Sequence, residues 1–180
     1  MSYKHHFKLV SVYNSRVNNQ LYKAALNLSK SELNKDMGAF FGSVLGTLNH
    51  VLVGDLLWLD RFKNHSDEYI SLKKIYNYPT PRTLSEVLYS NFEELNQVRK
   101  KVDEIIINWI NGETNDIDFE RNLTYQNSRG TTSSRHFGEV VSHFFNHQTH
   151  HRGQASTLLS QLGYDMGVTD FIIDIPEEQA

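Results

Sequence analysis

The chain has 180 residues, the size of one domain at roughly 150 residues per domain. Hydrophobic residues make up 39% and charged residues 22%, which is ordinary for a folded protein and excludes wholesale disorder. The formal net charge is −3 and there is no dense Lys/Arg block, so neither a nucleic-acid partner nor a polybasic membrane anchor is expected.

Cysteine is absent from the sequence, which excludes disulfides, thiolate metal ligands and reactions that use a thiol of the protein itself. The first residues lack an apolar signal core, and no apolar run is long enough to cross a membrane. We therefore expect one cytoplasmic domain over residues 1–180, without a membrane partner.

Most of the sequence has the apolar spacing of helices, and proline, the strongest helix breaker, is scarce. Only three prolines occur, two of them close together at Pro79 and Pro81, and apolar residues three and four apart fill the long stretches around them. The first predicted helix spans about residues 5–28. The capping-box spacing of Ser29 and Glu32 predicts a short helical turn after it.

The second predicted helix, about residues 38–62, is apolar on nearly every side, which is typical of a central, buried helix. Residues 64–82 are polar and contain the proline pair, so an irregular connection is expected there. A second capping box starting at Thr83 predicts a third helix over residues 83–111, with Gly112 as its left-handed stop.

Residues 115–134 break the helical pattern and predict short strands, with turn chemistry at residues 127–130. The apolar residues that carry this expectation are Ile117, Phe119, Leu123 and Tyr125. The last predicted helix spans about residues 135–162 and stops at Gly163, and the tail after it is expected to lie over the helices. Four helices of about 25 residues each predict an all-α fold, a four-helix bundle, with a short irregular or β-hairpin excursion between helices 3 and 4.

Candidate metal ligands gather in the last predicted helix, where five of the nine histidines fall within sixteen residues: His136, His143, His147, His150 and His151. Spacings of four and three make His143/His147, His147/His151 and His147/His150 possible ligand pairs. At about 100° per residue, with His143 at the origin, the apolar face centres near about 120°, His147 at about 40° and His151 at about 80°. The pair His147/His151 is therefore favoured, with hydrogen-bonded core histidines as the alternative, and the other three are interpreted as a solvated polar stripe.

A third ligand must come from another segment. The candidates are His50 in the apolar second helix, His65 in the connection, and His5 and His6 at the start. His50 lies on a stripe of smaller, more polar residues, which marks either a cavity or close helix packing. Periodicity leaves both alternatives open.

Several segments carry a family resemblance. Residues 38–50 and 54–62, with His50 ahead of Gly54 and Trp58, resemble the second helix of the DinB family of damage-inducible proteins, and residues 143–154 resemble that family's last-helix signature. This is the metal-binding helical family, distinct from the DNA polymerase of the same name. Shorter matches are Leu123-Thr124-Tyr125 with Gly130, and Tyr13-Asn14.

The resemblance implies a four-helix bundle, usually a homodimer, in which a divalent metal ion is held by three histidines. Carried over by position, these ligands are His50, His147 and His151, and the last two are the pair that helical angle favours independently. The family's relatives include enzymes that transfer small thiols such as bacillithiol or mycothiol to electrophiles, isomerases that use such thiols, and members without an assigned activity. Zinc or nickel is the expected ion.

Three neutral imidazoles leave a divalent ion its full charge and an open position, where water or a substrate thiol becomes more acidic. Because the chain has no cysteine, a thiol nucleophile must arrive as a low-molecular-weight molecule that attacks an electrophilic substrate. We therefore expect a metal-dependent transferase or hydrolase. The alternatives are a non-catalytic, stress-linked module with a structural ion, and a helical bundle without metal.

Polar residues next to the predicted ligands have open roles, and none is assigned as catalytic. Asp55 is placed either to accept the second N–H of a ligand histidine or to pair with an arginine or the backbone. Gln154 is three residues past His151 and is expected at the rim of the site, whereas Arg152 is expected to face a neighbouring helix or partner.

Overall fold

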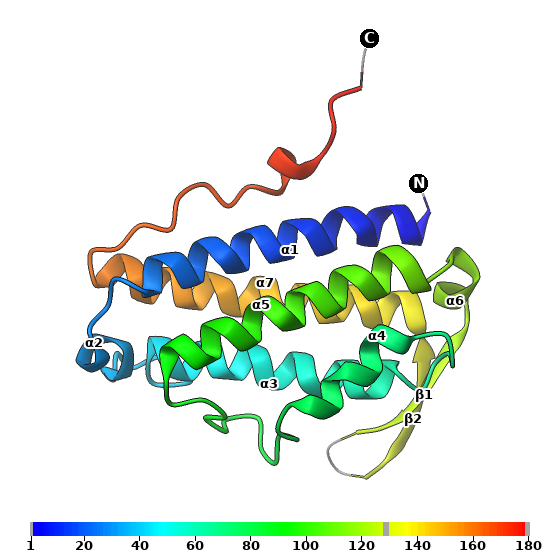
Figure 1. Ribbon diagram of the computed structural model, residues 1–180, viewed down its shortest axis with the longest axis horizontal. Coiled ribbons are helices and arrows are strands. Elements are labelled where there is room, and N and C mark those ends of the chain that lie inside the picture. Colours follow the sequence, from blue (N-terminus) through cyan, green and yellow to red (C-terminus); the bar gives the residue numbers. More distant parts are fainter. Residues whose placement is uncertain (1, 128–129, 179–180) are drawn as a thin grey trace.

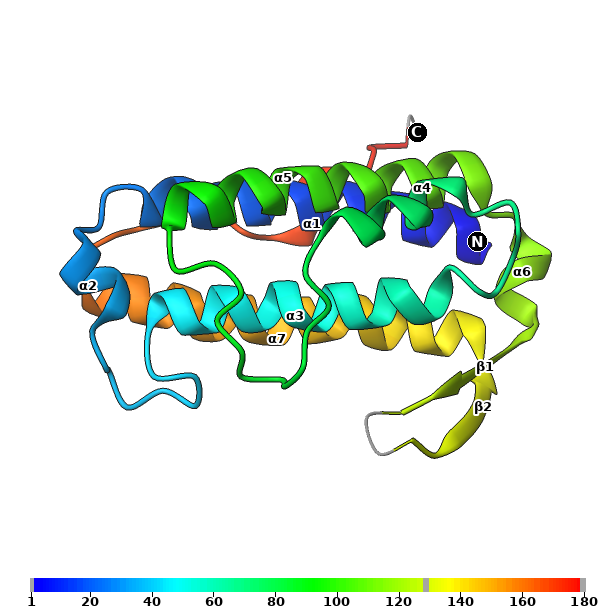
Figure 2. The same ribbon diagram turned by 60° about the horizontal axis from the view of Figure 1, so that its bottom comes forward.

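The computed structural model describes residues 2–127 and 130–178, which are mostly helical with one small antiparallel sheet. The long helices within these residues are α1 (Tyr3–Ala25), α3 (Val44–Phe62), α5 (Phe92–Asn108) and α7 (Phe137–Gln161). They lie side by side (Figure 1), and the turned view of Figure 2 shows α1 beside α5 and α3 beside α7. Since α7 also contacts α1, it joins the two pairs. The expectation of a helical fold is confirmed.

Short elements connect the long helices. They are α2 (Lys30–Asn34), α4 (Ile70–Lys73), η1 (Lys74–Asn77), η2 (Trp109–Glu113), α6 (Asp116–Glu120) and η3 (Phe171–Asp174). The strands β1 (Asn122–Gln126) and β2 (Thr132–His136) form an antiparallel hairpin directly before α7. None of the described helices combines the length and apolar character that crossing a membrane requires.

An aromatic cluster holds α3 against α7 near the hairpin. The Phe62 ring, at the end of α3, lies 5.3 Å from the Phe137 ring and 5.6 Å from the Phe144 ring, both on α7. Trp109, which is fully buried at the start of η2, lies 5.5 Å from Phe62 and joins the end of α5 to the same cluster. Most residues of α3 are buried, as its apolar character on every side predicts. The two helices that carry the candidate ligands are therefore packed firmly together.

The start of the second predicted helix is wrong by six residues. Residues 38–43 form a tight turn in which Gly38 and Gly42 have φ values of 71° and 72°, the left-handed conformation that glycine adopts without strain. Helix α3 begins only after Ser43, whose hydroxyl accepts a hydrogen bond from the Gly46 N–H. The turn matters for the site because it carries Phe41.

The start of the third predicted helix is also wrong. The chain from Pro79 to Asn91 is irregular, and α5 begins at Phe92, where the Asn91 side chain accepts from the Glu94 N–H at 2.9 Å. The irregular segment is held over α3 by the buried Asn49, which exchanges two hydrogen bonds with the backbone of Tyr89. These two hydrogen bonds favour the irregular path over the helix that the residue spacing around Thr83 predicts.

The end of the third helix differs as well, because α5 runs into the π-helical turn η2 and Gly112 does not adopt the left-handed conformation. By contrast, Gly163 has a φ of 85° and ends α7 as predicted. The capping box of Ser29 and Glu32 is confirmed at the start of α2.

The excursion before α7 is only partly a hairpin. Leu123 and Tyr125 lie on β1, as predicted, opposite Arg135 and Ser133 of β2. Ile117 and Phe119 instead belong to the short helix α6, because Asn115 and Asp118 form a capping box there. In the predicted turn over residues 127–130, Ser128 and Arg129 lie outside the described residues.

The segment after α7 lies along α1, as predicted (Figure 1). Arg16 of α1 forms a salt bridge with Asp174 at 2.7 Å and donates to the carbonyl oxygens of Val168 and Asp170. The Tyr13 ring lies 5.0 Å from that of Phe171. These contacts fix the tail along α1.

Candidate metal centre

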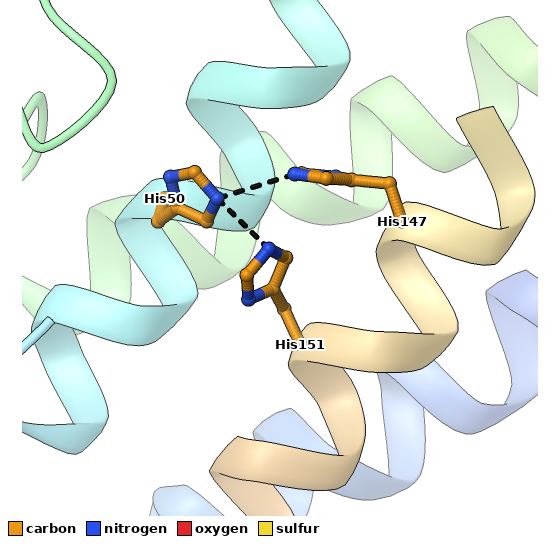
Figure 3. Close-up of side chains that lie close together, drawn as sticks. All are labelled: His50, His147 and His151. Atoms are coloured by element: carbon orange, nitrogen blue, oxygen red, sulfur yellow. Dashed lines mark hydrogen bonds between the residues drawn. The ribbon is translucent and has the colours of Figure 1, made fainter. Parts of the chain in front are cut away.

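Three imidazoles converge between α3 and α7 (Figure 3). The Nε2 atom of His50 on α3 lies 3.2 Å from His147 Nε2 and 3.0 Å from His151 Nε2, both on α7. Among the described residues, these three form a group whose ligand atoms all lie within 4.8 Å of one another. Bonds of about 2.1 Å at tetrahedral angles would put ligand nitrogens about 3.4 Å apart, close to the observed distances. The structure thus brings together the three residues carried over from the family resemblance.

Two features produce this arrangement: the helical spacing of the histidines on α7, and a glycine on α3 that leaves space for one of the rings. His147 and His151 are four residues apart, so they lie on one face of α7 on successive turns. His147 reaches His50 across the position of Gly54 on α3. A Cβ atom at Gly54 would lie 2.6 Å from His147 Cε1 and 3.1 Å from His147 Nδ1, so only glycine leaves room for this ring.

The outer nitrogens of two of these rings are held by oxygen acceptors. His50 Nδ1 lies 2.7 Å from the carbonyl oxygen of Leu84, and His151 Nδ1 lies 2.8 Å from Gln154 Oε1. Since both oxygens accept hydrogen bonds, each Nδ1 carries the proton and each Nε2 presents its lone pair to the centre. Such partners fix the tautomer and the orientation of metal-binding histidines.

Electrostatics favour the neutral form of all three rings. Burial, and to a smaller extent the neighbouring histidines, lower the pKa of His147 to about 3. Burial also lowers the pKa of His50 and of His151, in spite of their hydrogen bonds to Leu84 and Gln154. Lone pairs that face one another about 3 Å apart repel unless a cation lies between them, and a low pKa disfavours a proton in that place. The donor set therefore fits a divalent metal ion.

An aromatic ring covers one side of the cluster. The Phe41 ring stacks on His50 with centroids 3.7 Å apart and planes 16° apart, and it meets the His151 ring edge-on at 5.5 Å. Phe41 belongs to the glycine turn before α3, so this turn shields the histidines from water on that side. The sequence pattern did not reveal this role, because residues 38–43 were predicted to be helical.

The other histidines do not join the cluster. His143 and His150 are exposed on α7, in agreement with the polar stripe predicted for them. His136 ends β2, 3.6 Å from Glu120, and His65 Nε2 lies 2.9 Å from the carbonyl oxygen of Asp118. His5 and His6 lie in the first turns of α1 and belong to no ligand group formed within residues 2–127 and 130–178.

Asp55 takes the second of its two predicted roles, since it pairs with Arg99 of α5 rather than with a histidine. Arg99 also contacts Asp103 at 2.9 Å, and Asn18 of α1 donates to Asp103 at 2.9 Å. Arg152 of α7 faces α1, as predicted, and donates to Asn14 and Asn18. This buried polar network joins α1, α3, α5 and α7.

Comparison with known proteins identifies the family of the chain. The model of the DinB family matches residues 1–179. The chain is also similar to "Protein DinB" of Bacillus subtilis (strain 168), with 25% identity over 167 residues, or 92% of this chain and 90% of that relative. No solved structure matches the chain significantly. The match over nearly its whole length shows that the chain belongs to the DinB family.

Proposed function

We propose that His50, His147 and His151 bind a divalent metal ion, zinc or nickel, through their Nε2 atoms. The observation that carries this proposal is the convergence of these three nitrogens. In two of the three rings, an oxygen acceptor also holds the Nδ1 atom. Neutral nitrogen donors of this kind suit both ions, and the donor set does not distinguish between them.

The architecture proposed around this ion is a single domain over residues 1–180, with α1, α3, α5 and α7 as a four-helix bundle. Their similar lengths and their mutual contacts support that arrangement. The homodimer is proposed on the family resemblance alone.

We further propose that the protein is a metal-dependent enzyme of the transferase or hydrolase type. When bound, the ion would supply the Lewis acidity that makes water or a small thiol nucleophilic at neutral pH. The chain's own residues hold the centre in place for this task. Leu84 and Gln154 fix two rings, Gly54 admits the third, and Phe41 keeps water away from one side.

One observation favours a second candidate, a non-catalytic module with a structural ion. The stacked Phe41 ring closes one side of the cluster, and structural ions are typically closed off from substrates. The two candidates differ in whether the loaded protein turns over a substrate.

The test is consumption of a low-molecular-weight thiol by the zinc- or nickel-loaded protein with 1-chloro-2,4-dinitrobenzene as the electrophile. We expect metal-dependent turnover that His147→Ala reduces by about 100-fold or more, because the loss of a ligand removes the ion. His150→Ala is the matched control, since His150 is an exposed histidine on the same helix, and it should keep wild-type activity. Absence of turnover with cysteine, glutathione and bacillithiol would favour the structural ion.

A further inference from the structure

A cavity of about 340 Å³ lies between α3, α7 and the hairpin. Its lining residues are Trp58, Tyr125, Arg135, Glu139, Val140 and His143. Trp58 is four residues past Gly54 on α3, and His143 is four residues before His147 on α7, so the cavity begins one helical turn beyond the ligand cluster. The His143 and His147 ring centroids are 6.3 Å apart.

The walls of this cavity are aromatic and only partly buried. The Trp58 ring meets the Tyr125 ring edge-on at 5.4 Å and the His143 ring edge-on at 5.4 Å. Val140 adds a buried aliphatic surface between the aromatic residues and α7. The Arg61 guanidinium lies over one face of the Trp58 ring and one face of the Tyr125 ring, so a further planar ring would meet the opposite faces or the edges, at centroid distances of about 4.5–7 Å.

Two arginines lie at these rings, Arg61 packed on them and Arg135 in the lining of the cavity. The Arg61 guanidinium lies 4.6 Å from the Trp58 ring centroid and 5.2 Å from that of Tyr125. Within residues 2–127 and 130–178, neither the Arg61 nor the Arg135 side chain forms a salt bridge. Burial lowers the pKa of Arg61 although Tyr125 and Asp60 raise it in part, so a further anion close by would stabilise its charged form.

The rim of the cavity carries one positive and one negative side chain. Arg135 on β2 and Glu139 on the first turn of α7 are both exposed, and they do not pair with each other. An anionic group on a ligand is therefore drawn toward Arg135 and repelled by Glu139, which fixes the direction in which the ligand enters.

We propose that this cavity binds a small planar aromatic molecule with one anionic group, its ring against Trp58 and Tyr125 and its charge at Arg135. The role of this molecule as the electrophilic substrate rests on the proposed enzymatic function, because the cavity would hold it one helical turn from the ion. The binding itself requires no turnover and is tested without it.

The test is a titration of the metal-loaded and metal-free proteins with 2-naphthalenesulfonate, followed by tryptophan fluorescence. The chain has two tryptophans, and because Trp109 is fully buried, quenching by a ligand reports on Trp58. We expect saturable binding at one site in both forms of the protein, and weaker binding of uncharged 2-methylnaphthalene.

Two variants locate the bound probe. Arg135→Gln and Tyr125→Leu are each expected to weaken binding by about tenfold, the effect of losing one charge-assisted contact or one ring contact. Arg82→Gln is the control, since Arg82 is exposed, lies outside the cavity and forms no salt bridge within the described residues.

Unchanged affinity in both cavity variants, or equal binding of the uncharged compound, would overturn the proposal. Thiol turnover with no probe binding would overturn this proposal and leave the enzymatic function standing. Probe binding without turnover would do the reverse, so the two failures are distinguishable.

Discussion

Gly54→Ala is expected to abolish tight metal binding while the fold survives. A methyl group there would lie 2.6 Å from His147 Cε1, and the ring must move because the α3 backbone cannot. Moving this imidazole takes its Nε2 away from His50 and His151, and two remaining ligands hold a divalent ion far more weakly. We expect the affinity for zinc to fall by about 100-fold or more. This is comparable to the largest effects of mutating residues that hold metal-binding side chains in place. Competition with a chromophoric chelator measures this affinity.

Gly153→Ala is the matched control for this substitution. Gly153 is an exposed glycine of α7 directly after Arg152, and a Cβ atom there meets nothing within 4 Å. Both substitutions raise helix propensity, by about 1 kcal/mol each, so backbone effects are shared. Only the Gly54 variant should lose zinc. Wild-type zinc affinity in that variant would refute the conclusion that Gly54 is needed to leave space for the His147 ring.

Arg99→Met is expected to destabilise the protein by about 3–5 kcal/mol, the usual effect of removing one partner of a buried ion pair. Arg99 is 1% exposed and contacts both Asp55 and Asp103, which are buried themselves. Methionine fills similar space but leaves two carboxyl groups without their guanidinium. Urea unfolding of the metal-free protein, monitored by circular dichroism, measures the loss.

The size of this effect should depend on pH in a definite direction. Burial raises the pKa of Asp55 to about 7 even though Arg99 lowers it in part, and burial also raises the pKa of Asp103. Without Arg99 both pKa values rise further, so above about pH 4 the folded variant holds protons that the unfolded chain releases. Because the wild-type protein keeps the Asp55 proton up to about pH 7, stability of the variant should fall, relative to wild type, mainly as the pH rises through 7.

Lys101→Met is the control for Arg99→Met, because Lys101 is exposed on the same helix and forms no salt bridge among the described residues. It should change stability by less than about 0.5 kcal/mol. A loss in Arg99→Met no larger than that of the control, or one that shrinks as the pH rises, would contradict the account of the buried network.

Much of the helical framework was predictable from the sequence because it follows from local periodicity. Apolar spacing located the long helices, and Gly163 marked the end of α7 correctly. The pair His147/His151 followed from the same arithmetic, because a helix fixes the direction of each of its side chains. His50 joined the pair only through the family resemblance, since the packing of α3 on α7 is a tertiary contact that spacing does not contain.

The error at the start of the third helix has its physical origin in a long-range contact. Thr83 and Glu86 have the spacing of a helix start, yet the segment is held in an irregular path by Asn49, a buried residue about 40 positions away. The same path places the Leu84 carbonyl group against His50 Nδ1. A backbone group has no sequence signature, so this partner of the site was not predictable.

The metal content of untagged protein tests the central claim most directly. After loading with zinc and desalting, elemental analysis should find about one ion per chain in the wild type and in His150→Ala, and none retained in His50→Ala or His147→Ala, because each of these two lacks one of three ligands. Stoichiometric zinc in both of the latter variants, or none in the wild type, would contradict the assignment of His50, His147 and His151 as the metal ligands.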